Sequence, residues 1–213
     1  MVAGQTLSLD QARWTVLWAR LGAKGTGQST FNQLEAAYAD LARAYHNTRH
    51  LLNCLQEFDR NQMLAARADE VEAALWFHDA VYAPGRSDNE AASARLAEAT
   101  LSIHSVAADS AQRVAALVLA TRHLSLSNDS DAQLVCDVDL SILGREAGEF
   151  DEFEDLIRRE YAWVPEPIYR TSRAAVLSGF LRRPSIYQSA PFVKRYERQA
   201  RQNLERAVAT LTR

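Results

Sequence analysis

The stretch "ALWFHDAVYAPG", residues 74–85, places a histidine and an aspartate inside an apolar segment that a Pro-Gly pair ends. On a helix, neighbouring side chains diverge by about 100°, so His78 and Asp79 cannot both point to solvent without exposing the aromatic residues beside them. A buried imidazole or carboxylate costs free energy unless it has a partner. We therefore expect His78 and Asp79 either to bind a metal ion or to form a hydrogen-bonded pair at the end of the helix.

Helical periodicity extends from this stretch over almost the whole chain, and no segment has the sustained alternation of a strand. Two helix starts carry the pattern of a capping box, Ser8 with Gln11 and Ser87 with Glu90. No linker or repeat divides the chain. The sequence therefore predicts an all-α fold, a single domain over residues 1–213 with about nine to ten helices. The helices are expected near 8–21, 30–41, 48–58, 69–81, 87–104, 110–123, 131–143, 149–163, 168–181 and from 191 onward.

The composition is that of an ordinary globular protein, with 47% apolar and 24% charged residues in 213. A net charge of −3 gives no electrostatic basis for binding nucleic acid or an anionic membrane. Cys54 and Cys136 have no CxxC spacing, which fits a reducing compartment. No apolar run approaches the ~20 residues of a membrane span, and no charged segment precedes an apolar one at the N-terminus. We expect a soluble cytoplasmic protein; a homodimer stays open.

Two further pairs of residues are candidates for a shared site with His78 and Asp79. His46 and His50 are four residues apart in "YHNTRH", so on a helix they share a face, although two solvent-facing histidines at a helix start would look the same. Asp137 and Asp139 lie in the apolar segment "LVCDVDLSILG". Because a spacing of two points them to different faces, we expect only Asp139 to join the site.

The order His50, then His78-Asp79, then Asp139 resembles the HD-domain superfamily of metal-dependent phosphohydrolases. The resemblance implies an HD-type helical bundle in which a metal-site core of roughly residues 30–145 is packed by the C-terminal helices. It also implies that His50, His78, Asp79 and Asp139 bind one divalent cation; Mn, Mg, Fe, Co, Ni and Zn all stay open. The similar segments are "YHNTRHLLNCL", "ALWFHDAVYAPGRSDNEAASA", "ATRHL", "CDVDLSILG", "IRREYAWVPEPIYRTSRAAVLSGFLRR" and "ERQARQNL".

The resemblance further implies hydrolysis of a phosphate ester or anhydride of a small, nucleotide-like molecule by attack of a metal-bound water. "YHNTRH" is similar to the start of cyclic-nucleotide phosphodiesterase sites, which makes His46 the candidate general acid. An imidazolium that titrates near neutrality can protonate a departing alkoxide. Asp79 counts among both the ligands and the catalytic residues.

Three other residues have both a functional and a structural interpretation. Glu90 either orients the attacking water or only caps a helix. The Glu-Asp pair of alarmone hydrolases is absent from "AVYAPG", and "ATRHL" lacks the Gly-Tyr-Pro of cyclic-dinucleotide phosphodiesterases. His123 either binds a second metal or substrate phosphate, or is stabilised at a helix C-terminus. Arg173 either binds substrate phosphate or pairs with the acidic residues at 151–154.

Two other functions remain possible from the sequence. A di-iron oxygenase on the same scaffold would need extra histidines between Asp79 and Asp139, and His104 and His123 occupy that interval. His104, however, lies in a polar segment and is expected at a helix end near the surface. The other alternative is a non-catalytic, metal-stabilised module that binds a nucleotide without turnover.

Overall fold

The computed structural model describes residues 7–213, and this part of the chain folds into ten α-helices and two short 3-10 helices without a strand. The predicted all-α class is therefore confirmed. No helix among these residues is long and apolar enough to cross a membrane. The elements are α1 (Gln11–Arg20), α2 (Gln28–Tyr38), α3 (Thr48–Asn61), η1 (Gln62–Leu64), α4 (Ala68–Phe77), α5 (Asn89–Ile103), α6 (Ala108–Ala120), α7 (Ser130–Asp139), η2 (Leu140–Gly144), α8 (Ala147–Glu160), α9 (Glu166–Leu181) and α10 (Ala190–Leu211).

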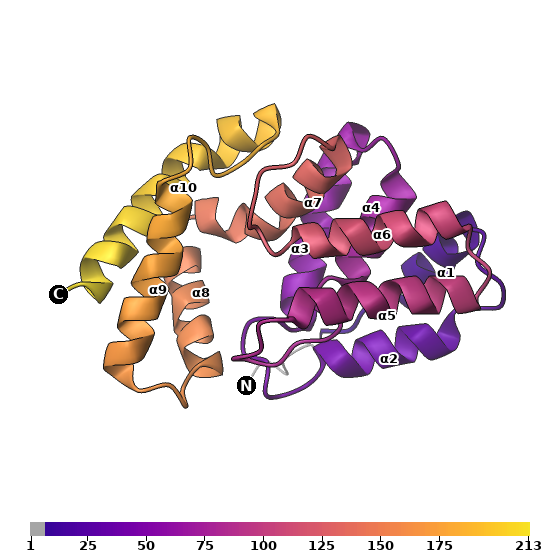
Figure 1. Cartoon of the computed structure of the whole chain (residues 1–213), viewed down its shortest axis with the longest axis horizontal. Coiled ribbons are helices and arrows are strands. Elements are labelled where there is room, and N and C mark those ends of the chain that lie inside the picture. The colour runs from indigo at the N-terminus through magenta and orange to yellow at the C-terminus, as the bar shows by residue number, and fades with distance from the viewer. Residues whose placement is uncertain (1–6) are drawn as a thin grey trace, which may run out of the picture.

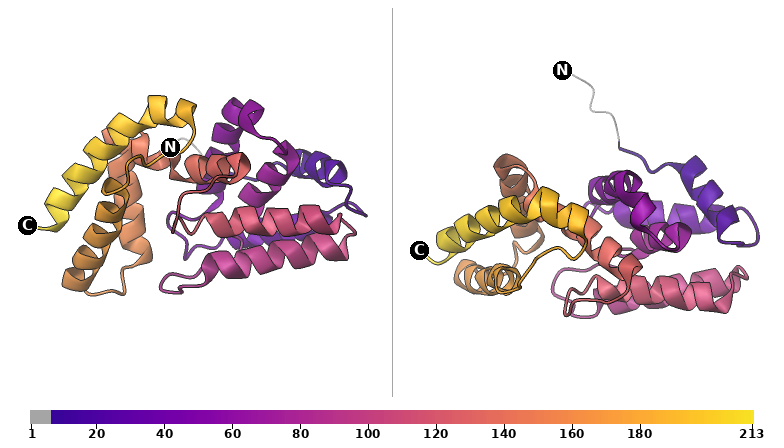
Figure 2. Two further views of the ribbon diagram at one scale, coloured as in Figure 1. Left: turned by 45° about the horizontal axis from the view of Figure 1, so that its top comes forward. Right: turned by 90° about the horizontal axis from the view of Figure 1, so that it is seen from above.

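The helices form two groups that meet at η2 (Figure 1). Helix α4 is the centre of the first group, where it contacts α1, α3, α5, α6 and α7. In the second group, α9 and α10 pack along each other, and both α8 and α10 contact η2. The views in Figure 2 show the same division, with α5 and α6 side by side in the first group.

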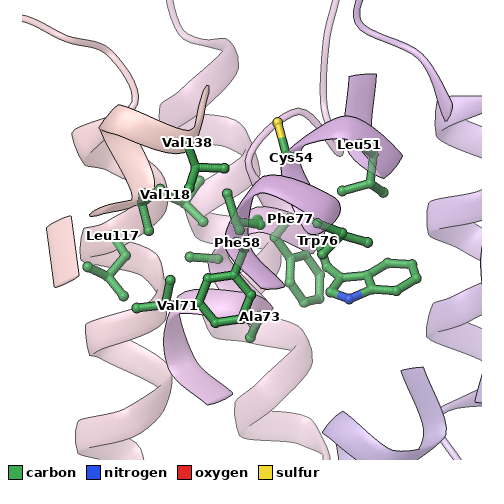
Figure 3. Packing of buried hydrophobic residues seen from close by; sticks show 14 of the residues in the cluster. Leu51, Cys54, Phe58, Val71, Ala73, Trp76, Phe77, Leu117, Val118 and Val138 are labelled. Carbon is green, nitrogen blue, oxygen red and sulfur yellow. The ribbon is translucent and has the colours of Figure 1, made fainter. Parts of the chain in front are cut away.

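Helix α4 is apolar enough to be surrounded by other helices. All its residues from Glu70 to Phe77 are buried. The rings of Trp14 and Trp76 lie 5.2 Å apart in an edge-on contact. Figure 3 shows Phe58, Trp76 and Phe77 in this core. Full burial of a large apolar side chain stabilises a fold by about 1.5–3 kcal/mol. This packing therefore holds the C-terminal end of α4 in a fixed position within the bundle.

Helix α4 ends at Phe77 and does not continue to Val81 as the periodicity predicted. Two side chains bind the backbone beyond its end and replace the missing helical hydrogen bonds. The hydroxyl of Tyr38 accepts from the N–H of Asp79 at 3.2 Å, and Arg43 donates to the carbonyl of Asp79 at 2.6 Å. His78 and Asp79 therefore lie in a tightly held turn at the C-terminus of a buried helix.

The two predicted capping boxes are wrong. Asp10, and not Ser8, caps α1 by accepting from the N–H of Arg13 at 3.1 Å. Helix α5 begins at Asn89, whose side-chain amide both donates to and accepts from the backbone of Ala83 at 3.1 Å. The amide of Asn89 holds the 83–88 loop against the start of α5 with two hydrogen bonds, which a Ser-Glu box could not provide.

Candidate metal centre

The four expected ligands come from three segments that pack together. His50 lies in the first turn of α3, whose N-cap Asn47 accepts from the N–H of Arg49 at 2.9 Å. His78 and Asp79 follow α4, and Asp139 is the last residue of α7. Because α3, α4 and α7 contact one another, these helix ends meet at one point of the bundle.

The donor atoms of these side chains converge. The Nε2 atoms of His50 and His78 lie only 3.0 Å apart. Oδ2 of Asp79 lies 3.1 Å from Nε2 of His78 and 3.5 Å from that of His50. Oδ1 of Asp139 lies 3.3 Å from Nε2 of His50 and 3.7 Å from that of His78. The carboxylates of Asp79 and Asp139 thus both lie near the two histidine Nε2 atoms, although Asp79 is not in the set of mutually close potential ligands, which is His50, Cys54, His78 and Asp139.

These separations fit a bound divalent cation. Metal–ligand bonds of about 2.0–2.2 Å place neighbouring ligand atoms of one ion about 3.0–3.5 Å apart. Oδ2 of Asp79 is buried and makes no well-aligned hydrogen bond, although it lies 3.1 Å from Nε2 of His78. A buried carboxylate oxygen without a partner is costly, and a cation would satisfy it. The residues therefore fit a metal ion.

The orientation of the His78 ring is also suited to ligation. Its Nδ1 lies 2.7 Å from the carbonyl oxygen of Leu75, so Nδ1 carries the proton and Nε2 faces the cluster. Burial disfavours a charged ring, but Asp79 and Asp139 raise the pKa of His78 to about 9. The surrounding carboxylates thus favour a positive charge at this position, which either a proton or a cation can provide.

Cys54 joins the cluster one helical turn after His50. One donor atom from each of His50, Cys54, His78 and Asp139 lies within 4.8 Å of the others. The thiol sulfur is 3.8 Å from both ring nitrogens of His50. Burial, followed by the charge of Asp139, raises the pKa of the Cys54 thiol well above its usual value. The i, i+4 spacing in "HLLNC" was the sequence signal for this neighbour, and our sequence analysis missed it.

Asp139 bridges the cluster to His123. Oδ2 of Asp139 lies 2.8 Å from Nε2 of His123, whereas Oδ1 faces His50 and His78. Burial opposes ionisation of Asp139, but the hydrogen bond with His123 and the nearby histidines hold its pKa well below the usual range. His123 follows α6 in the left-handed region, at φ 53°. The contact orients the carboxylate of Asp139 toward the cluster.

His46 lies beside the cluster in a pair with Glu160, the last residue of α8. The Glu160 carboxylate is fully buried and lies 2.7 Å from Nδ1 of His46. It also accepts from the N–H groups of Tyr45 and His46 at 2.8 and 2.9 Å, and from the hydroxyl of Tyr82 at 2.8 Å. The ring of His46 stacks on Tyr82 at 4.1 Å, and its centroid is 5.8 Å from that of His50.

The charges of this pair stabilise each other. Burial opposes charge on both groups, but the hydrogen bond from His46 lowers the pKa of Glu160 to about 2. Burial also disfavours a charged His46, but Asp79 and Glu160 raise the pKa of its ring above the ordinary value. With Nδ1 held by Glu160, Nε2 of His46 is the ring nitrogen left for another partner. Glu160 had no sequence signal, because only the fold brings α8 to this position.

Two residues that we selected for a role in substrate binding or catalysis lack a contact with the cluster. Glu90 lies in the first turn of α5, and its carboxylate takes part in no hydrogen bond or ion pair within residues 7–213. Arg173 donates to Glu154 at 3.2 Å, and its guanidinium lies over the ring of Phe153 at 5.3 Å. Arg173 thus forms the ion pair with the acidic segment that was the structural alternative.

Asp137 and His104 have structural partners of their own. Asp137 accepts from the N–H groups of Gln188 and Ser189 at 2.8 and 2.7 Å, and so holds the segment that starts α10. His104 ends α5, where its Nδ1 lies 3.2 Å from the carbonyl of Lys24 and its ring contacts Trp18 at 4.8 Å. Neither residue belongs to the group of potential metal ligands.

Comparison with known proteins gives no relative whose site could be compared with this one. No family model matches the chain, and neither a curated protein nor a solved structure does. The resemblance to the HD-domain superfamily therefore depends on the residues themselves, and functional inference depends on the geometry described above.

Proposed function

We propose that this protein is a divalent-metal-dependent phosphohydrolase of the HD-domain type, acting on a small phosphorylated molecule such as a nucleotide. The observation that carries the proposal is the convergence of four donor atoms from three segments beside a buried imidazole–carboxylate pair. Metal ligands alone would fit many functions. A positioned proton donor next to them is what hydrolysis of a phosphate ester requires.

In this proposal His50, His78, Asp79 and Asp139 hold the cation. When bound, a divalent cation polarises a phosphoryl oxygen and lowers the pKa of water toward neutrality. The protein orients these ligands with further contacts. The Leu75 carbonyl fixes the tautomer of His78, and His123 fixes the carboxylate of Asp139.

His46 supplies the proton for the leaving group. Glu160 holds Nδ1, so the second ring proton of the imidazolium is on Nε2. Although burial opposes a charged ring, Asp79 and Glu160 raise the pKa of His46, which favours the form that carries this proton. As a water oxygen bonds to phosphorus and the P–O bond to the leaving group breaks, the Nε2 proton passes to the departing oxygen. The proton that the water loses goes to solvent, from which the neutral imidazole of His46 is reprotonated. The stack on Tyr82 keeps the ring in place during this transfer.

The di-iron oxygenase is disfavoured by the position of His104. That hypothesis uses both His104 and His123 as extra iron ligands, but His104 is engaged with Lys24 and Trp18 at the end of α5. His123 alone lies beside the cluster. The remaining alternative is a binding module without turnover, and only a measurement of activity distinguishes it from an enzyme.

The test is a screen for phosphate release from nucleotides and simple phosphoesters with Mn²⁺, Mg²⁺, Fe²⁺, Co²⁺, Ni²⁺ and Zn²⁺. His50→Ala removes a ligand, and His104→Ala serves as the matched histidine control. We expect turnover that His50→Ala abolishes and His104→Ala retains. Equal activity in the wild type and His50→Ala would refute the proposal, and nucleotide binding without turnover under any metal would favour the binding module.

A further inference from the structure

A polar cavity of about 220 Å³ opens directly onto the candidate metal centre. Its wall includes His50, Cys54 and Asp139 from the cluster, together with Arg60, Arg145 and Ser141. Pockets for drug-sized ligands have volumes of about 300–1,000 Å³. This cavity is smaller, so it is suited to a small ion or a single polar group. The mechanism above does not use Arg60 or Arg145.

Arg60 and Arg145 belong to a group with excess positive charge. The carboxylate of Glu57, which is fully buried, pairs with Arg60 at 3.1 Å, Arg145 at 3.0 Å and Arg195 at 3.4 Å. Three guanidinium groups around one carboxylate leave two positive charges. The exposed Glu149 at the cavity offsets one of them. Arg60 and Arg145 line the cavity and Arg195 does not, so two of the three guanidinium groups border it.

Both arginines also have guanidinium N–H groups that do not donate to Glu57. A guanidinium has five N–H donors, and Arg60 and Arg145 each give one nitrogen to Glu57. The guanidinium of Arg145 is further fixed over the ring of Tyr196 at 5.6 Å. An oriented guanidinium with free donors is the group that binds phosphate oxygens most effectively in proteins.

We propose that the cavity formed by Arg60, Arg145 and Ser141 binds a phosphate dianion next to the metal centre. This inference rests on the proposed function, because a phosphohydrolase must accommodate either the phosphoryl group of its substrate or the phosphate that it releases. Both sources present the same chemistry to the arginines. The cavity adjoins a larger cleft of about 530 Å³ through the shared residues Tyr45, His50 and Asn53, which leaves room for the organic part of a substrate.

The first experiment measures inorganic phosphate binding to the purified full chain by calorimetry, with and without added Mn²⁺. The variant is Arg60→Gln, and the matched control is Arg195→Gln. Both arginines pair with Glu57, and their side chains are 49% and 50% exposed, but only Arg60 lines the cavity. We expect Arg60→Gln to weaken phosphate binding about tenfold, as loss of one charge-assisted hydrogen bond predicts, with Arg195→Gln within about twofold of wild type.

The inference would be overturned if phosphate failed to bind to the wild type, or if both substitutions weakened phosphate binding equally. Phosphate binding that depends on Arg60 in a protein without phosphatase activity would support the anion site while the proposed function fails. In an active protein, a raised KM in Arg60→Gln identifies the phosphoryl group of the substrate as the occupant. An unchanged KM with weaker inhibition by free phosphate identifies the product.

Discussion

His46 and Glu160 are 114 residues apart in the sequence, and Nδ1 of one lies 2.7 Å from Oε2 of the other. His46 lies just before α3 in the first group of helices, and Glu160 ends α8 in the second. The contact therefore joins the two groups at the candidate metal centre. Since the carboxylate also accepts from two backbone N–H groups, it cannot turn away from the imidazole without losing them.

Glu160→Gln tests whether this carboxylate positions and charges His46. We expect kcat to fall by about 10–100-fold, because general acid catalysis contributes at least about 100-fold. Loss of the negative charge lowers the pKa of His46, so the decline of kcat at high pH should move to lower pH. Bound metal should be unchanged. Tyr82→Phe is the control, because it removes one donor to the same carboxylate and leaves the contact with His46. A pH profile identical to wild type would contradict the positioning role.

The same carboxylate makes stability depend on pH in acid. The pKa of Glu160 is about 2 in the fold, against 4.5 for an unperturbed glutamate. Between these values the unfolded chain binds more protons, so the free energy of unfolding rises with pH across this window. The stabilisation is complete above pH 4.5 and is lost as the pH falls to about 2. Urea denaturation at several pH values should show a shallower rise for Glu160→Gln than for wild type; identical slopes would count against a charged Glu160 in the fold.

Asp137 and Asp139 allow a matched test of the metal centre. Asp139→Asn should strongly reduce bound metal, because Oδ1 of Asp139 faces both histidine ligands. Asp137→Asn should retain the metal but lower the free energy of unfolding by about 1–3 kcal/mol, since it weakens the bonds to the N–H groups of Gln188 and Ser189. Elemental analysis and denaturation measure the two effects. Metal loss in Asp137→Asn with retention in Asp139→Asn would reverse our assignment.

The sequence predicted what depends on local pattern. Helical periodicity gave the all-α class, and polar residues inside apolar helices pointed to His78, Asp79 and Asp139, which the structure brings together with His50. The capping boxes failed because α1 begins two residues later, capped by Asp10, and because the side chain of Asn89 bonds the preceding loop at Ala83. Glu160 could not be predicted, because its role depends on how α8 packs. Arg60 and Arg145 could not be selected from the sequence either, because only the fold brings both to Glu57.

Cys54 lies among the potential ligands, and cobalt can show whether it binds the ion. Burial keeps its thiol protonated, and a protonated thiol is a poor ligand. Asp79 already provides a fourth donor, whose Oδ2 makes no well-aligned hydrogen bond. We therefore expect the Co²⁺-loaded protein to lack a sulfur-to-cobalt charge-transfer band, with a spectrum that Cys54→Ser leaves unchanged. A band that disappears in Cys54→Ser would make Cys54 a ligand.

Removal of the metal should destabilise the fold by a measurable amount. Without a cation, Nε2 of His50 and His78 remain 3.0 Å apart, and buried Oδ2 of Asp79 has no well-aligned hydrogen bond. A ligand at 100 times its dissociation constant stabilises the native state by about 2.7 kcal/mol. For a chain of this size that corresponds to a Tm about 5–10 °C higher. Calorimetry should show this loss on treatment with a chelator and its recovery with added metal. His50→Ala should melt at the same temperature with and without chelator; a wild type equally indifferent to the chelator would show that the cluster holds no ion.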